Sequence, residues 1–586
     1  MRRFHTLLSL ILCVCLLTCC SFDPTQKNPV ENKDFSDFTE QIFRQMAASD
    51  SLTLNYTVAS PKNFDIKELP VGFSSFTYED LSEDSTVCEN MLAKVQAFDR
   101  SGLSSQQKIL YDCLVHSLKT ECKSYSYTAF TKGLSPTNGI QAQLPVLLAE
   151  FHFDDEEDVA QYLALIRSVP DYFQSLLSIE KKKKELGTLP SRETLSRIAG
   201  QCDEFIKEDG SSMVQQRFEK KISEVSFLTD GARQQLTAQH QNDLNQYLKP
   251  AYVNLSQELR QLISDTGEFP SGNLCDYQPD GSSYYDFLVH ETTGSSLSLD
   301  EMESLMLTTL IQAKDSLVSL AAQKPSLFSS CDRYAAKFHS SREILSFLQQ
   351  AIATDFPSIK KSTFEVRQVD ESLENYLSPA FYLTPPIDDT DHHVIYLNPS
   401  TPYDSSSLYH TLAHEGYPGH LYQNAYFAQT NPPHLRFLLD FGGYSEGWAT
   451  YAELYSYTYT GLTPEEISIL RNNLLISLCL YGLCDLGVHR HGWSKDQLHD
   501  FLNQYGSWDE QICASVYQSI LDEPASYLKY TVGYLEFIRL RQQMKDELGE
   551  SYSDQIFHTY VLESGPAPFC VLSASMEPWC KEFTKN

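Results

Sequence analysis

A short run of residues near position 414 carries side chains that bind metal ions and move protons. The stretch HTLAHEGYPGH, from His410 to His420, holds three histidines and one glutamate. Histidine nitrogens and carboxylate oxygens are ligands of catalytic zinc sites, which use three protein ligands and leave one position for water. A further carboxylate beside that water takes its proton. The stretch therefore contains the residue types of a metal-dependent hydrolase.

Two pairs of histidines in this stretch could bind one metal, and spacing alone leaves both open. His410 and His414 are four residues apart, about 40° round a helix, as in H-E-x-x-H. In that pair, however, Glu415 follows the second histidine rather than the first. His414 and His420 place Glu415 directly after the first histidine, yet on a regular helix they lie about 240° apart. In the third interpretation, the histidines of this stretch bind no metal and are ordinary residues of a helix end or of the core.

Pro418 and Gly419 weaken the objection to the second pair. A proline inside a helix loses a hydrogen bond, and its ring clashes with the carbonyl four residues earlier, here that of His414. Glycine permits backbone angles that other residues avoid. The sequence therefore predicts a helix through the cluster with a local bulge, and a bulge that absorbs two residues would restore helical spacing between His414 and His420.

A third ligand is expected from a second helix, GYSEGWATYAELYSYTYTG, which ends at Gly461. Glu446 lies twenty-six residues after His420, an interval that suits a helix, a loop and a helix. Glu453 follows seven residues later on the same face, and Asp440 is a weaker candidate because it lies in the loop. The alternative for Glu446 is a carboxylate that the helix dipole favours in a first turn.

Helices are predicted for most of the chain, because apolar residues recur at three- and four-residue intervals. Residues 158–187 and 298–323 show the pattern clearly, with a glycine stop in the first and a Ser/Asp entry in the second. The clearest strand candidate is Val394–Leu397, which precedes the histidine cluster. The segment 378–388 is rich in proline and should be extended or turning.

The N-terminus predicts export with a lipid anchor. Residues 1–20 combine two arginines with a short apolar stretch, which indicates a signal peptide rather than a membrane span. The ending LLTCC resembles a lipobox, with Cys20 as the lipidated residue and Cys19 as the alternative. Residues 21–37 read as a flexible tether, and 38–586 as a single large domain. No later segment is expected to cross a membrane.

Charge and cysteines narrow the class of protein. The formal net charge is -32, which would repel a phosphate backbone and argues against a nucleic-acid partner. Eleven cysteines follow Cys20, without a C-x-x-C pair. Neither a zinc ribbon nor a thioredoxin-type site is therefore indicated, and an odd number leaves at least one thiol outside any intramolecular disulfide. Spacing leaves the disulfide pairing and the oligomeric state open.

Several motifs together resemble one family, the bacterial domain-of-unknown-function 885 (DUF885) proteins, which are helical and grouped with glutamate-ligand zinc metallopeptidases. The motifs are HEGYPGH, SEGWATYAE, DLGVHRHGWS, EPASYLKYTVGYLEFIRLR and FHTYVLESGPAP. The resemblance implies that His414, His420 and Glu446 bind one Zn²⁺ and that Glu415 is the general base. It also places His410 outside the metal site.

The resemblance suggests roles for further residues. Tyr530 would donate to the oxyanion of the tetrahedral intermediate, or would be a packed core tyrosine. His489 would orient substrate or support a ligand, or would be a helix-end histidine. Tyr396 lies in the strand expected to pair with an extended peptide. Arg539 falls in a matching motif and is assigned to substrate binding.

These observations combine into one expectation. The protein should be mainly α, a large helical metallopeptidase-like fold with a small strand element beside a deep active-site cleft, and residues of about 380–586 should form the metal-binding part. It should be an exported, lipid-anchored zinc peptidase of the bacterial cell envelope, acting on short peptides. The alternatives are a metal-dependent hydrolase of a non-peptide amide and a non-catalytic surface binding lipoprotein.

Overall fold

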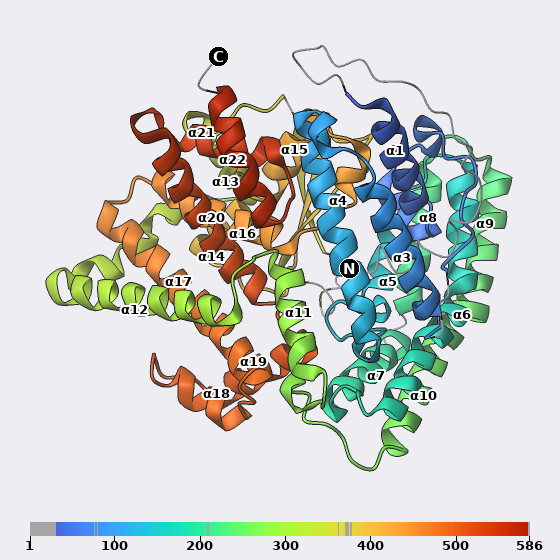
Figure 1. Cartoon of the computed structure of the whole chain (residues 1–586). Coiled ribbons are helices and arrows are strands. Elements are labelled where there is room, and N and C mark those ends of the chain that lie inside the picture. The colour runs from blue at the N-terminus through green and yellow to red at the C-terminus, as the bar shows by residue number, and fades with distance from the viewer. Residues whose placement is uncertain are drawn as a thin grey trace. The chain divides into compact units, whose positions relative to one another are not determined.

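Helices account for most of the computed structural model, which describes residues 31–583 except 75–76, 79, 208–209, 361, 370–373 and 375–377. The prediction of a mainly α protein with a small strand element is confirmed. The described residues fall into two compact units. Unit 1 runs to Phe269 and includes Pro386–Asp389 and Pro432–Asp440, and unit 2 comprises the remainder. The single domain expected from residue 38 stays a prediction, and elements of both units appear in Figure 1.

Unit 1 is built from helices alone among its described residues. They are α1 (Lys33–Ala47), α2 (Ser51–Thr57), α3 (Asp80–Gln96), α4 (Ser105–Ser124), α5 (Ile140–Glu150), α6 (Glu156–Leu186), α7 (Arg192–Lys207), α8 (Gly210–Glu224), α9 (Asp230–Asp243) and α10 (Lys249–Ser264).

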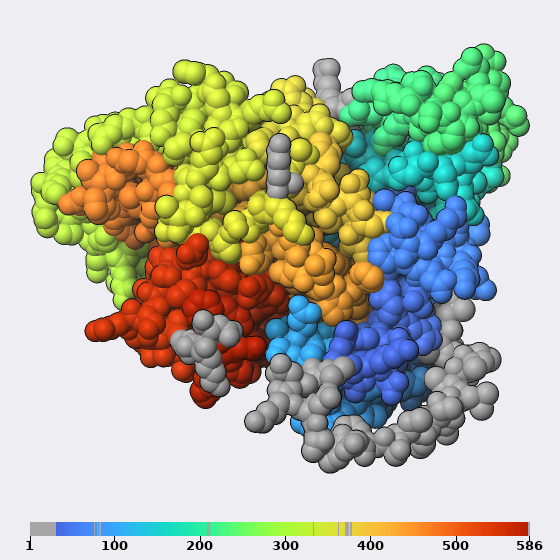
Figure 2. Space-filling model, turned by 90° about the horizontal axis from the view of Figure 1, so that it is seen from above, coloured from blue at the N-terminus to red at the C-terminus, as the bar shows by residue number. Residues whose placement is uncertain are grey.

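Unit 2 holds the helices and strands around the histidine cluster. They are α11 (Gly281–Thr293), α12 (Leu299–Gln323), α13 (Ser341–Ala351), β1 (Thr363–Gln368), β2 (Ala380–Leu383), β3 (His392–Leu397), α14 (Ser405–Glu415), α15 (His420–Gln429), α16 (Gly442–Ser456), α17 (Pro464–His489), α18 (Lys495–Leu502), α19 (Glu510–Asp522), α20 (Leu528–Leu548), α21 (Asp554–Ser564) and α22 (Phe569–Phe583). Within unit 2, α21 and α15 are in contact, and on the surface seen in Figure 2 the red C-terminal residues adjoin orange residues.

Local sequence signals explain the ends of the long helices. α6 ends where Gly187 adopts a φ of 72°, a left-handed conformation that glycine takes without strain. α12 begins after Ser298, whose side chain accepts from the backbone N–H of Glu301 in a capping box. Both helices confirm the predictions made from periodicity and from cap residues.

The small sheet has the strand order β1-β3-β2. β3 pairs in parallel with β1, with Glu365 opposite Val394, and antiparallel with β2, with Tyr382 opposite Ile395. The predicted strand at residues 394–397 is confirmed, but it is the central strand. Its two edges are already paired, so the exposed edge nearest the cluster belongs to β2.

One described helix, α17, is long and apolar enough to cross a membrane, with a mean hydropathy of 1.5 over its best window. The expectation that no such segment follows the signal region was wrong in this respect. α17 packs against α12, α19 and α20, and about a third of its most apolar window is buried. Length and composition alone therefore do not make it a spanning segment.

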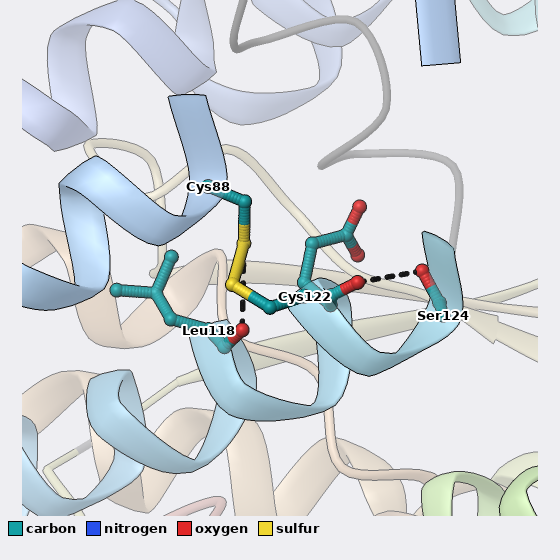
Figure 3. Close-up of a disulfide and its surroundings, with 5 residues drawn as sticks. Cys88, Leu118, Cys122 and Ser124 are labelled. Carbon is teal, nitrogen blue, oxygen red and sulfur yellow. Dashed lines mark hydrogen bonds between the residues drawn. A yellow bond between two sulfur atoms is a disulfide. The ribbon is translucent and has the colours of Figure 1, made fainter. Parts of the chain in front are cut away.

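A disulfide joins α3 to α4 within unit 1. Its partners are Cys88 and Cys122, thirty-four residues apart in sequence, and the Cys88 sulfur lies 3.4 Å from the Leu118 carbonyl oxygen (Figure 3). This pairing could not be read from spacing. Disulfides persist in oxidising compartments and are rare in the cytosol, so the bond agrees with an exported chain.

The first described helix shortens the predicted tether. α1 begins at Lys33 rather than after residue 37, because Asn32 caps it by accepting from the backbone N–H of Phe35. Phe35 is fully buried, which holds this turn against the unit. Cys20, the predicted lipidation site, lies outside the described residues.

Candidate metal centre

The helix through the histidine cluster is broken rather than bulged. α14 ends at Glu415 and α15 begins at His420, with residues 416–419 forming a loop between them. The Tyr417–Pro418 peptide bond in this loop is cis. The prediction that Pro418 and Gly419 disrupt regular helix spacing holds, but the two histidines lie on separate helices. The angle of about 240° that a continuous helix would place between the side chains of His414 and His420 therefore does not apply.

Two contacts fix this loop. The indole N–H of Trp448, a fully buried residue of α16, donates to the carbonyl of Pro418 at 3.0 Å. Gly419 lies so close to α14 that an added Cβ would come within 1.7 Å of the His414 carbonyl oxygen. Only glycine fits at this position. The loop is therefore held both to the helix that carries Glu446 and to the helix that carries His414.

The three predicted ligands come together. Each of His414, His420 and Glu446 offers one donor atom, and these atoms lie within 4.8 Å of one another. Nε2 of His414 is 3.5 Å, and Nε2 of His420 3.4 Å, from the same Glu446 oxygen, Oε2. The cluster is partly exposed, since each of these side chains keeps 16–19% of its surface accessible. These residues could hold a metal ion.

A close crossing of α16 and α20 brings Glu446 to the start of α20 (Figure 1). A Cβ added to Gly447 would lie 2.4 Å from the carbonyl carbon of Gly533, and one added to Gly533 would lie 2.3 Å from the Gly443 carbonyl oxygen. The two backbones are therefore in direct contact. Lys529, in the first turn of α20, consequently reaches Glu446 and places Nζ 3.0 Å from Oε1.

Tyr530 also lies at the cluster, as predicted. Its ring centroid is 6.3 Å from that of His414, and the Glu446 carboxylate is close enough to its hydroxyl to act on its pKa. Burial and the nearby negative charge of Glu446 raise the pKa of Tyr530 well above its usual value. The phenol therefore stays protonated at neutral pH and is able to donate a hydrogen bond.

Glu415 is held by the edge of the sheet. The backbone N–H of Tyr382 in β2 donates to Oε2 of Glu415 at 2.9 Å. This N–H points away from β3, because Phe381 and Pro379 face β3 through the hydrogen-bonded pairs of the antiparallel ladder. The carboxylate expected to act as base is thus hydrogen-bonded to the side of β2 that points away from β3, and its charge acts on His414 and Tyr530.

Glu453 was placed on the face of Glu446 by its seven-residue spacing, but its role was not predicted. Its Oε2 lies 3.2 Å from Nδ1 of His414, and its Oε1 lies 3.3 Å from Nδ1 of His410. His410, at the ideal helical spacing, therefore faces Glu453 and is not part of the donor cluster. Helical periodicity was the available signal, because residues 446 and 453 are two turns apart on one face.

Opposite charges shift the pKa values of the cluster strongly. Burial acts to lower the pKa of His414, but hydrogen bonds to Glu446 and Glu453 outweigh it and raise that pKa to about 10. Burial acts to raise the pKa of Glu446, but hydrogen bonds from both histidines and the charge of Lys529 hold it well below its usual value. At neutral pH the Glu446 carboxylate is therefore ionised, and the protonated His414 supplies positive charge beside it.

His489 is not available for substrate binding, and that prediction was wrong. The side chain is fully buried. Its Nδ1 accepts from the backbone N–H of Leu274 at 3.2 Å, and its Nε2 donates to the carbonyl of Ile520 at 2.9 Å. Both ring nitrogens are thus engaged with the main chain, and His489 links α17 to the segments before α11 and at the end of α19.

Arg539 is also removed from the cluster. Nine residues separate it from Tyr530 on α20, which corresponds to about 13 Å along the helix and half a turn around it. Its guanidinium pairs with Glu536 at 2.9 Å, and half of its side chain is exposed. Arg539 therefore lies away from the metal cluster, and its assignment to substrate binding stays a prediction.

Tyr396 lies in the central strand and supports the sheet. Its ring stacks on Phe381 with centroids 5.0 Å apart, and only 4% of the residue is exposed. Because β3 is already paired on both sides, it cannot pair with a peptide as was expected. The strand edge that remains available belongs to β2, in the proline-rich segment predicted to be extended or turning.

The comparisons agree with the motifs. The sequence matches the family described as "Bacterial protein of unknown function (DUF885)" over residues 73–576. The chain belongs to this family. No curated protein matches it.

Two solved structures share the fold of this DUF885 protein. A "putative lipoprotein" from Colwellia psychrerythraea has a TM-score of 0.79 at 19% identity, with 94% of this chain and 99% of that one covered. A "putative lipoprotein of unknown function" from Shewanella oneidensis has a TM-score of 0.66 at 15% identity, with 92% and 98% covered. A "putative oligoendopeptidase F" from Bacillus anthracis str. Ames reaches a TM-score of only 0.28 at 9% identity and carries no argument.

Proposed function

We propose that this DUF885 protein is an exported, lipid-anchored, zinc-dependent peptidase. The observation that carries the proposal is the convergence of His414 Nε2 and His420 Nε2 on one oxygen of Glu446, at 3.5 and 3.4 Å, with Glu415 adjoining His414 in the chain. Two imidazoles and one carboxylate form the ligand set of a catalytic zinc site with an open position.

The separations of the donor atoms support a small tetrahedral ion. Zinc–ligand bonds of about 2.0–2.2 Å at tetrahedral angles separate neighbouring ligand atoms by about 3.3–3.6 Å. Both histidine–Glu446 distances fall in this range. Zinc would therefore fit without a large movement of these side chains.

The charge of the cluster supports a divalent cation. Glu415, Glu446 and Glu453 contribute three negative charges, and Lys529 contributes one positive charge. A histidine binds a metal in its neutral form, so metal binding releases the extra proton of His414. With neutral histidines the sum is minus two, which one divalent cation balances. Uncompensated charges in a partly buried site are costly, so a site with this composition favours such an ion.

The side chains around the cluster can perform amide hydrolysis. When bound, zinc would polarise the scissile carbonyl and lower the pKa of the attacking water. Glu415 would take the proton from that water and pass it to the leaving amine. Tyr530, which stays protonated, would donate to the oxyanion as negative charge develops.

The free edge of β2 supports a peptide as the substrate. Alternate main-chain groups of β2 point away from β3, and among the described residues no strand pairs with that side. An extended peptide can add to such an edge through its own main chain. The edge lies directly at Glu415, through the Tyr382 N–H, so a peptide there would lie beside the proposed base.

Export and anchoring rest on separate observations. Residues 1–20 have the composition of a signal peptide that ends in a lipobox-like LLTCC. The Cys88–Cys122 disulfide agrees with an oxidising compartment, and structures with this fold are described as those of lipoproteins. We expect Cys20→Ser to release the protein from the membrane fraction, whereas Cys19→Ser should leave it bound.

The catalytic proposal is tested with a mixed peptide library and mass spectrometry of the products. The zinc-loaded protein should cleave, a chelator should stop cleavage, and Glu415→Gln should bind zinc but lose activity by about 10²-fold or more. Glu550→Gln, at an exposed glutamate, is the matched control and should remain active.

Each negative result has a different meaning. Bound zinc without cleavage would contradict the peptidase proposal and direct attention to non-peptide amides or to a binding role. A purified protein that takes up no metal would contradict the site itself.

A further inference from the structure

Glu446 uses its two oxygens for different partners. Oε2 faces Nε2 of His414 and of His420, while Oε1 lies 3.0 Å from Nζ of Lys529. A carboxylate can bind a metal through one oxygen or through both. Here a cation already occupies the second oxygen, on the side away from the histidines.

We propose that Lys529 is a positioning residue that restricts Glu446 to binding the metal through Oε2 alone. The inference rests on the proposed metal site and deepens it. An ammonium group at Oε1 both neutralises that oxygen and forms a charge-assisted hydrogen bond with it. The metal is then left with three protein donors and keeps an open position, which a catalytic site needs.

Several contacts hold Lys529 in this place. It lies in the first turn of α20, and the close crossing at Gly447 and Gly533 sets the distance from that turn to Glu446. Its Nζ lies 5.1 Å from the centroid of the Tyr530 ring, within the range of a cation–π interaction. Only 26% of its side chain is exposed, so the ion pair is partly shielded from water and salt.

A lysine suits this task better than an arginine. The ammonium is a compact point charge that binds one oxygen, whereas a guanidinium presents a planar fork that engages both carboxylate oxygens. An arginine at position 529 would therefore compete with the metal for Oε2. A methionine would leave Oε1 without its cation and able to turn to the metal as an additional ligand.

Cobalt substitution gives a readout that does not depend on turnover. Co²⁺ bound to four ligands absorbs visible light several-fold more strongly than Co²⁺ bound to five or six. We expect an intense spectrum for the wild type and a spectrum at least twofold weaker for Lys529→Met. For Lys529→Arg we expect at least tenfold weaker Co²⁺ binding in competition with a chelator.

Lys545→Met provides a matched control on the same helix. Lys545 also lies over a tyrosine, with its Nζ 5.2 Å from the ring centroid of Tyr552, and the substitution removes the same charge. Its Co²⁺ spectrum and affinity should equal those of the wild type. Circular dichroism of every variant tests whether the variant is folded. If Lys529→Met is not folded, Lys529→Gln takes its place.

The outcomes separate this inference from the proposed function. A wild type that binds no Co²⁺ or Zn²⁺ overturns both. Metal binding with spectra that are the same for the wild type, Lys529→Met and Lys529→Gln overturns the role of Lys529 and leaves the metal site standing. A weaker spectrum in the Lys529 variants, but not in Lys545→Met, supports it.

Discussion

Oε2 of Glu453 lies 3.2 Å from Nδ1 of His414, on the side of the imidazole ring opposite to the Nε2 that faces Glu446. A carboxylate at Nδ1 keeps the proton on that nitrogen, so the lone pair of Nε2 is directed to the cluster. A hydrogen bond of this kind orients a metal-binding histidine and raises its basicity.

Replacing Glu453 should therefore weaken metal binding without removing a ligand. We expect Glu453→Gln to bind zinc about 10–100-fold more weakly than the wild type, measured by competition with a chromophoric chelator. The control is His410→Gln, which changes the other partner of Glu453 and should alter the affinity much less. Equal affinities for Glu453→Gln and the wild type would show that His414 does not depend on this contact.

Metal content should distinguish the two candidate histidine pairs. His420→Ala should lose stoichiometric zinc, because one of three donors disappears from the cluster. His410→Ala should retain about one zinc per chain, because the Nδ1 of His410 faces Glu453 rather than the cluster. Elemental analysis of the two dialysed variants beside the wild type is sufficient. Loss of zinc in His410→Ala would contradict the assignment of His414 and His420 as the metal-binding pair.

The helix crossing beneath the cluster should not tolerate a methyl group. Gly447→Ala places a Cβ within 2.4 Å of Gly533, which forces α16 and α20 apart. We expect the free energy of unfolding to fall by about 1–3 kcal/mol and zinc binding to weaken, because Glu446 precedes Gly447. Gly200→Ala is the control, since the space around that helical glycine is open; it should stabilise by about 0.5–1 kcal/mol.

Acid should destabilise the fold through His558, which is fully buried. Its Nδ1 donates to the Asp355 carbonyl at 2.5 Å, its Nε2 accepts from the Tyr451 hydroxyl at 2.9 Å, and burial lowers its pKa to about 4. An unfolded histidine takes up a proton near pH 6.5. Between about pH 6.5 and 4 the unfolded chain therefore binds more protons than the folded chain. The free energy of unfolding consequently decreases as the pH is lowered through this range, by up to about 3 kcal/mol.

The variant His558→Gln can keep both hydrogen bonds but does not titrate in this range. Its stability, measured in chelator so that metal binding does not contribute, should fall less between pH 7 and 5 than that of the wild type. His339→Gln, at an exposed histidine, should follow the wild type. Parallel pH curves for His558→Gln and the wild type would count against this source of acid sensitivity.

Reduction should destabilise unit 1. The Cys88–Cys122 bond closes a loop of thirty-four residues, which in the chain-entropy account contributes about 4 kcal/mol. The double variant Cys88→Ala/Cys122→Ala should unfold at lower denaturant and become insensitive to reductant. Cys570→Ser, at an exposed cysteine of α22, should behave as the wild type, and an equal response of the double variant and wild type to reductant would contradict the prediction.

The sequence was informative where neighbouring residues decide the structure. Gly187 and Ser298 predicted helix ends because a cap acts within one turn, and HEGYPGH with SEGWATYAE identified the residues of the cluster. The end of α14 was not predictable in the same way. The loop is held by Trp448, thirty residues from Pro418 in the chain, and a distant partner of this kind leaves no local pattern.

The wrong assignments have related causes. His489 lies in a family motif, but its partners Leu274 and Ile520 come from distant segments, so its burial could not be seen beforehand. β2 is four residues long between prolines, too short for an alternating pattern to stand out. Arg539 is different, because its half-turn offset from Tyr530 follows from helix geometry and already places it away from the cluster.

The hydrogen bond between the Tyr382 N–H and Glu415 has a consequence for the order of events at the site. That N–H is also the group with which a chain adding to the β2 edge would pair, and one hydrogen cannot fully serve two acceptors. A peptide that pairs there must displace the carboxylate. Under the proposed peptidase function, docking of a peptide at this edge would release Glu415 from the hydrogen bond, and the carboxylate would become available as a base only once substrate is bound.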